Sequence, residues 1–193
     1  MSTTTKVSLV KFFDFSERSV LAQIIWIMLF TAATAVGARF EIPHEPVPYT
    51  LQTLVVLLAG AFLGAQNGAA SQLLYLAAGA IGAPVFAGGA FGVARLFGPT
   101  GGYLIAYPIA AAVIGYLVQK RRGLLWTFIS MAVGLLIIFT VGTLHLYAFH
   151  LHNWSAAFNS GFLLFTWWDC IKLCAASMTY HEVAKRWPKV PEE

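Results

Sequence analysis

The feature that most constrains this chain is the length of the apolar stretches between its few charged residues. Hydrophobic residues make up 59% of the sequence and charged residues 10%, whereas a soluble domain carries about 25% charged residues. This small number of charged residues cannot cover a surface that faces water. The predicted surroundings of the protein are therefore lipid. A spanning helix needs about 20 mostly apolar residues. Six candidate spans predict an all-α integral membrane protein, a bundle of six transmembrane helices: 20–38, 50–64, 68–82, 100–119, 124–149 and 161–182.

The basic residues predict how this bundle is oriented, because cytoplasmic loops carry an excess of Lys and Arg. With six spans, three basic clusters fall on one side: Lys6, Lys11 and Arg18; Lys120, Arg121 and Arg122; Lys185, Arg186 and Lys189. On the opposite side lie Arg39 and Arg95 alone. Both termini are therefore expected in the cytoplasm.

The domain organisation is expected to be simple. Residues 1–193 are predicted to form one membrane domain, with 1–19 as a cytoplasmic or interfacial N-terminus and 186–193 as a cytoplasmic tail. The first 19 residues carry charges and no long apolar core, so no cleavable signal peptide is expected. No internal repeat is evident, which disfavours an inverted-repeat transporter. Cys170 and Cys174 are expected to pack as small apolar residues rather than form a disulfide or a zinc site.

Two loops on the predicted outer side have unusual compositions. Residues 39–50, RFEIPHEPVPYT, contain three prolines, which favour an extended and stiff chain. Residues 82–100, GAPVFAGGAFGVARLFGPT, are apolar and rich in glycine. An apolar loop of this length is not expected to remain in water, so it should fold back onto the bundle.

Asp169 and Lys172 lie in the outer half of the last predicted span. Charge at membrane depth is costly, so such groups normally face a cavity or one another. Their spacing of three places them on one helix face. Two interpretations remain open at this stage: a mutually neutralised structural pair, or a polar site for a ligand that enters from outside.

Other polar residues flank the outer ends of the spans. Thr50 is either a helix cap or a ligand contact, and Gln52 offers both donors and an acceptor. Tyr75 is either a packing residue or a ligand contact. Arg95 is either an interfacial side chain or a clamp for a carboxylate, which suits the arginine fork.

Metal and enzyme chemistry are both disfavoured. The spacings of His145, His150 and His152 do not put all three on one helix face, so they are expected to be interfacial histidines, with no metal site. The sequence contains no G-x-x-x-x-G-K-[ST] loop for ATP hydrolysis, and no motif that pairs a nucleophile with a base. No cofactor is expected.

Four stretches resemble the BioY family, the biotin-binding S components of energy-coupling factor (ECF) transporters: PVPYTLQTLVVLLAG, GAASQLLYLAAGAIGAPVFAGG, GPTGGYLIAYPIAA and DCIKL. The resemblance implies a six-helix protein of a bacterial or archaeal cell membrane that captures biotin from outside. It also implies three partners, a transmembrane coupling protein and two cytoplasmic ATPases, which suits the missing ATP motif.

The resemblance also implies a binding site. The family's Asp and Lys on the last helix match Asp169 and Lys172, and its glycine-rich stretch matches Gly98 to Tyr103. Glycine lets backbone approach a ligand closely, and biotin combines a ureido ring with an acid tail. We expect Asp169 to accept a ureido N–H or to orient Lys172, and Lys172 or Arg95 to meet the carboxylate. The predicted site is Asp169, Lys172, Arg95, Gln52, Thr50, Tyr75, Phe86, Gly98, Pro99, Thr100, Gly101, Gly102 and Tyr103.

Partner docking is predicted at small residues of the first span, because small side chains allow close helix approach. These are Ala33, Thr34, Gly37 and Ala38. Three alternatives to a biotin subunit remain: an S component for another vitamin, a stand-alone secondary transporter in which Asp169 carries a proton, and, least supported, a membrane enzyme.

Overall fold

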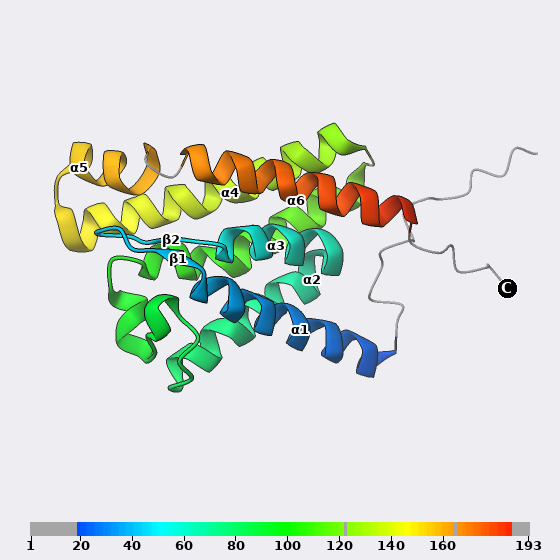
Figure 1. The fold of residues 1–193 in the computed structure, drawn as a ribbon, viewed down its shortest axis with the longest axis horizontal. Helices are drawn as coiled ribbons and strands as arrows, with labels where there is room; N and C mark the ends of the chain where they lie inside the picture. Colours follow the sequence, from blue (N-terminus) through cyan, green and yellow to red (C-terminus); the bar gives the residue numbers. More distant parts are fainter. Residues whose placement is uncertain (1–18, 122, 164–165, 187–193) are drawn as a thin grey trace, which may run out of the picture.

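The computed structural model describes residues 19–121, 123–163 and 166–186, and most of them are helical. Nearly all of the predicted cytoplasmic N-terminus and of the predicted tail lies outside these residues, as does Arg122. Five long helices form the bundle in Figure 1: α1 (Val20–Arg39), α2 (Gln52–Ala80), α3 (Gly101–Lys120), α4 (Leu124–Leu146) and α6 (Thr166–Arg186).

The prediction of a helical membrane protein is confirmed. Among the described residues, four helical segments are long and apolar enough to cross a membrane: Val20–Arg39, Gln52–Ala80, Gly101–Lys120 and Leu124–Leu151. The last helix, α6, is not among them, since Asp169, Lys172 and the charged residues near its end interrupt its apolar character. Many large apolar side chains face outward, as lipid contact requires, and α1 is the least enclosed of the four segments.

The two predicted spans at 50–64 and 68–82 are joined within α2, which is interrupted at Gly64 (φ 78°, ψ −177°). The chain doubles back at this residue. Gln52 Nε2 donates a hydrogen bond to Tyr75 Oη at 2.5 Å across 23 positions, whereas a straight helix would separate such residues by about 35 Å. Thus α2 consists of two arms packed side by side, a first arm (52–63) and a second arm (65–80).

Helix α3 forms the centre of the bundle and is the most enclosed of the four apolar segments. Its Gly115 lies directly against the turn of α2, where an added methyl group would clash with the backbone of Gly64 and Ala65. The residue before Gly115 on α3, buried Ile114, packs beside Gly134 of α4. Glycine on α3 and α4 therefore sets how closely the helices of the core approach one another.

The end of the bundle opposite the C-terminal end of α6 is covered by short elements (Figure 1). Strands β1 (Glu41–Ile42) and β2 (Tyr49–Thr50) pair antiparallel, which gives the proline-rich loop its extended form. The glycine-rich loop contains two short 3₁₀ helices, η3 (Ala87–Gly89) and η4 (Val93–Phe97), and folds back on α2, as predicted: Gly92 N donates to Gly79 O at 2.7 Å. Between α4 and α6 lie three short helical elements: η5 (Tyr147–Leu151), α5 (Trp154–Phe158) and η6 (Asn159–Leu163).

The turn at Gly64 should tolerate no side chain. Its backbone angles belong to a region that only glycine occupies readily, and an added methyl group would lie 2.7 Å from Gln119 Nε2. We expect Gly64→Ala to destabilise the protein by about 1–3 kcal/mol, measured as a lower midpoint of thermal unfolding in detergent. The control is Gln66→Ala, an exposed helical position just after the same turn. Equal midpoints for the two variants would contradict the doubled-back arrangement.

Candidate ligand-binding site

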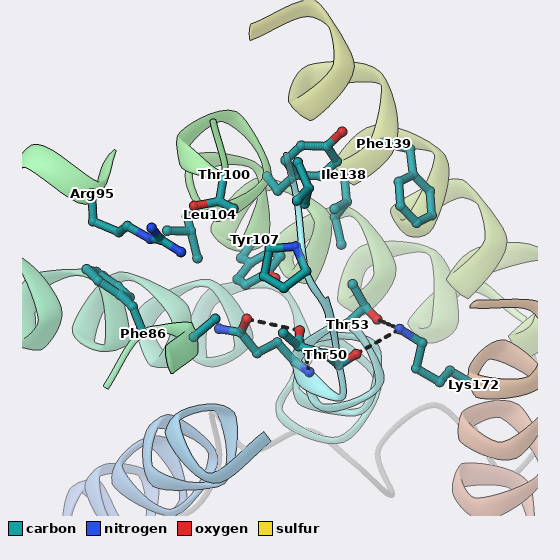
Figure 2. A pocket seen from close by; sticks show the side chains of 15 residues that line it. Thr50, Thr53, Phe86, Arg95, Thr100, Leu104, Tyr107, Ile138, Phe139 and Lys172 are labelled. Atoms are coloured by element: carbon teal, nitrogen blue, oxygen red, sulfur yellow. Dashed lines mark hydrogen bonds between the residues drawn. The ribbon is translucent and has the colours of Figure 1, made fainter. Parts of the chain in front are cut away.

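A small cavity of about 40 Å³ lies near the covered end of the bundle, between segments that are distant in sequence. Figure 2 shows its lining side chains, which come from both outer loops and from the helices below them. The lining is Val47, Pro48, Thr50, Gln52, Thr53, Phe86, Ala87, Arg95, Thr100, Tyr103, Leu104, Tyr107, Ile138, Phe139 and Lys172. Most of it is apolar or aromatic, with a few polar groups, which is the usual composition of a small-molecule site.

Asp169 and Lys172 form a buried ion pair, with Nζ and Oδ1 2.5 Å apart and side chains 1% and 6% exposed. Lys172 Nζ also donates to Thr50 O at 2.9 Å and to Thr53 Oγ1 at 2.5 Å. Thr53 Oγ1 in turn donates to Asp169 Oδ1 at 2.8 Å. All three protons of the ammonium group therefore have partners, whereas Asp169 Oδ2 is buried with none among the described residues.

This ionic cluster continues into a second set of hydrogen bonds along α2. Thr50 Oγ1 donates to Gln52 Oε1 at 3.0 Å, and Gln52 Nε2 donates to Tyr75 Oη. The hydroxyl of Tyr75 then donates to Val85 O at 3.2 Å, which ties the start of the glycine-rich loop to the second arm of α2. Thr50 and Gln52 thus reach the cavity from a fixed network, while Tyr75 lies behind the lining and packs edge-to-face on Phe86.

Arg95 reaches the cavity from η4, on the side opposite Lys172 (Figure 2). Its guanidinium is partly buried and makes no hydrogen bond or ion pair with any described residue. Phe86, fully buried, lines the cavity from the same loop. The cavity therefore has a neutralised ionic cluster on one side and an unpaired cation on the other.

The GPTGGY stretch is used mainly for contacts within the protein. An added methyl group at Gly101 would clash with Leu96 of η4, and one at Gly102 with His145 of α4. These glycines and Gly98 and Pro99 are not in the cavity lining, whereas Thr100 and Tyr103 are. Thr100 Oγ1 is buried without a hydrogen-bond partner among the described residues, so it is free to meet a ligand.

Several lining residues were not predicted from the sequence. Tyr107 lies one helical turn after Tyr103, so the spacing of the two tyrosines on α3 could have indicated it. Ile138 and Phe139 on α4 had no such signal, because apolar residues within an apolar span look alike. Thr53 stands near the start of the second predicted span, but its position between both charges depends on the fold.

The other predicted residues lie away from the cavity. His145 and His150 have ring centroids 5.6 Å apart, and His150 Nε2 lies 3.1 Å from Phe97 O, so the pair connects α4 and η5 to η4. The described residues contain no group of three metal-ligating side chains. Of the predicted docking residues, Thr34, Gly37 and Ala38 are buried and only Ala33 is partly exposed. Gly37 and Thr34 face α2, where Gln72 Nε2 donates to Thr34 Oγ1 at 3.2 Å.

Comparison with known proteins gives the family. The model of the BioY family matches residues 4–189, nearly the whole chain. This chain belongs to the BioY family. Membership places it among multi-pass membrane transport proteins rather than enzymes.

Individual BioY relatives match most of the length of this chain, and a solved structure has a similar fold. The biotin transporter BioY of Thermotoga maritima is 40% identical over 158 residues, which cover 82% of this chain and 93% of that protein. The probable biotin transporter BioY of Pyrococcus horikoshii is 40% identical over 80% of this chain and 91% of its own. A crystal structure of the S-component for biotin from an ECF-type ABC transporter is 27% identical, with a TM-score of 0.81, covering 86% of this chain and 92% of that one.

The buried ion pair of this BioY protein predicts how single and double substitutions of Asp169 and Lys172 change the stability of the fold. Removing one partner of a buried pair leaves an uncompensated charge and costs about 3–5 kcal/mol. We therefore expect Lys172→Met to lower the thermal unfolding midpoint strongly, and the double variant with Asp169→Asn to recover part of the loss. Lys185→Met is the matched control, because Lys185 and Glu182 form an exposed pair at the same spacing on α6. A loss no larger than that of the control would show that the buried pair is not needed for stability.

Proposed function

We propose that this protein is the biotin-binding membrane subunit of an ECF-type importer, which captures biotin from the extracellular side. Support comes from the functions of its relatives, which are named as biotin transporters and as the S-component for biotin. The structural observation that carries the proposal is the opposition of two different polar groups, the ionic cluster and Arg95, across an apolar cavity. Biotin has the same division, because a ureido ring and a carboxylate lie at its two ends.

The carboxylate is assigned to Arg95 rather than to Lys172. Lys172 already donates to Thr50, Thr53 and Asp169, so it has no proton left for an acid. Arg95 has no such partner, and its guanidinium suits a carboxylate geometrically. The ureido group is assigned to the side of the ionic cluster, where Thr50, Gln52 and Lys172 line the cavity; Asp169 is not in the lining and contributes by holding Lys172.

Binding requires this cavity to grow. Its volume of about 40 Å³ is far below the roughly 300–1,000 Å³ of typical ligand sites. The outer loops supply Val47, Pro48, Phe86 and Arg95 to the lining, and these residues lie outside the long helices of the bundle. We therefore assign the opening to displacement of these two loops rather than to separation of the helices.

The two arms of α2 and the helix α6 complete the proposed set of six spans, with both termini in the cytoplasm. The doubled-back course of α2 supports counting its arms separately. The basic residues at the ends of α3 and α6 support the orientation, because Arg121 and Lys185 line one cavity and Lys120 adjoins Arg121. Energy would come from partners, a transmembrane coupling protein and two ATPases, since the sequence lacks an ATP-binding loop.

Calorimetric titration of the purified protein in detergent tests the ligand. We expect saturable binding of biotin and none of thiamine or riboflavin, because only biotin presents a ureido ring and a carboxylate together. The sample must show a cooperative unfolding transition, so that a negative result counts. Binding of another vitamin in place of biotin would reassign the protein to a different substrate.

The role of Arg95 predicts how the protein distinguishes an acid from an ester. Losing a hydrogen bond to a charged group costs about 1.5–3 kcal/mol, so Arg95→Gln should weaken biotin binding by about 10- to 100-fold. Biotin methyl ester, which lacks the charge, should bind this variant about as well as biotin does. Lys120→Gln removes a charge from the far end of the bundle and serves as the control. An unchanged preference for the acid in Arg95→Gln would show that another residue meets the carboxylate.

A further inference from the structure

A second cavity, of about 170 Å³, lies where the end of α3, the start of α4 and the end of α6 come together. Figure 1 shows these helix ends at the side of the molecule away from the β1–β2 pair. The cavity shares no lining residue with the ligand-binding site described above. This volume is well above the minimum that a single water molecule needs, so the cavity can admit a larger group.

The lining changes in character from the inside of this cavity to its mouth. Two hydroxyl side chains, Thr127 and Tyr180, line it and are only 2% and 8% exposed. Val118 and Ala184 add apolar wall. The remaining side chains are all basic or potentially basic: Arg121, His181 and Lys185. None of the described lining residues is acidic.

The fold positions these side chains rather than leaving them scattered. On α6, residues 180, 181, 184 and 185 lie on one helix face by their spacing. The guanidinium of Arg121 lies over the ring of Trp126, 5.3 Å from the ring centroid, and Trp126 Nε1 donates to Leu117 O at 2.7 Å. The aromatic ring is thus fixed by α3 and holds Arg121 beside the cavity.

Among the described residues, the positive charge of this site is only partly compensated. Arg121 makes no ion pair with any described residue, and Lys185 has one exposed pair, with Glu182 at 3.0 Å. Hydroxyl groups and an arginine fork are the donors that proteins use for phosphate oxygens. The composition of the cavity therefore fits a phosphate group that carries negative charge.

The surroundings favour a phosphate that is attached to a lipid. Leu124 and Leu125, at the start of α4, are 42% and 73% exposed and directly follow Gly123, which lines the cavity. Such residues offer apolar surface for acyl chains, while the basic cavity offers a place for the headgroup. Basic pockets between membrane helices at the cytoplasmic side are suited to anionic headgroups. We propose that this cavity binds the phosphate of an anionic phospholipid and so connects the ends of α3, α4 and α6.

The test compares defined lipids on the purified full chain in a mild detergent. The probe is phosphatidylglycerol, with phosphatidylcholine as the uncharged counterpart, and binding is measured by native mass spectrometry and by the rise in thermal unfolding midpoint. We expect phosphatidylglycerol to bind and stabilise, and the double variant Arg121→Gln/Lys185→Gln to bind it much more weakly, by about fivefold for each charge removed. Glu182→Gln should bind more tightly, because it removes the acid that competes for Lys185.

Lys120→Gln is the matched control, because Lys120 lies at the same end of the bundle but over Tyr116, outside the cavity. If Lys120→Gln lost as much phosphatidylglycerol binding as the double variant, the effect would be one of general charge and the proposed site would be overturned. Equal binding of phosphatidylcholine and phosphatidylglycerol would also overturn it. Titration with inorganic phosphate distinguishes the source of the group: binding as tight as that of the lipid would show that the site takes free phosphate and overturn the lipid. Retained biotin binding by each variant confirms that it is folded.

Discussion

The structure depends on how this chain keeps two charges inside a membrane protein. Burial of an isolated ammonium or carboxylate group is costly, and the cost is offset only when each charge has a partner and hydrogen bonds. Lys172 and Asp169 meet this condition only because Thr50 and Thr53 lie beside them. These threonines come from β2 and the start of α2, so the same contacts that satisfy the charges also hold α6 against the first arm of α2. The polar side of the cavity is thus a direct result of how the last helix is anchored.

The helices were largely predictable from the sequence, because an apolar run bounded by charged residues or glycine has few conformations other than a helix available to it in lipid. The run at 20–38 became Val20–Arg39 and the run at 100–119 became Gly101–Lys120. The break in α2 was expected between the predicted spans at 50–64 and 68–82, but the residue at which the chain turns, Gly64, was not, because the turn packs against Gly115 across the bundle. The short elements between α4 and α6 could not be predicted, because their two π-helical turns have no pattern that distinguishes them from an ordinary helix.

The candidate site was predictable where a polar residue stood in apolar surroundings, as at Gln52, Asp169 and Lys172. It was not predictable where packing alone places a side chain, as for Ile138 and Phe139. The glycines of GPTGGY show a different difficulty. Their backbone freedom was expected to serve a ligand, whereas Gly101 and Gly102 admit Leu96 and His145 of the protein itself. A sequence can show that something must come close to a glycine, but not which group does so.

The anchoring of the glycine-rich loop has a mechanical consequence. Near its start, Pro84 O accepts a hydrogen bond from Arg39 Nη2, at the end of α1; near its other end, Phe97 O lies 3.1 Å from His150 Nε2 of η5. The two ends of the loop are therefore held by helices on different sides of the bundle. Between these anchors lie Gly88, Gly89 and Gly92, all with positive φ, a backbone conformation that glycine adopts without strain. Any relative movement of α1 and α4 would stretch or slacken this segment, and Arg95 would be carried with it.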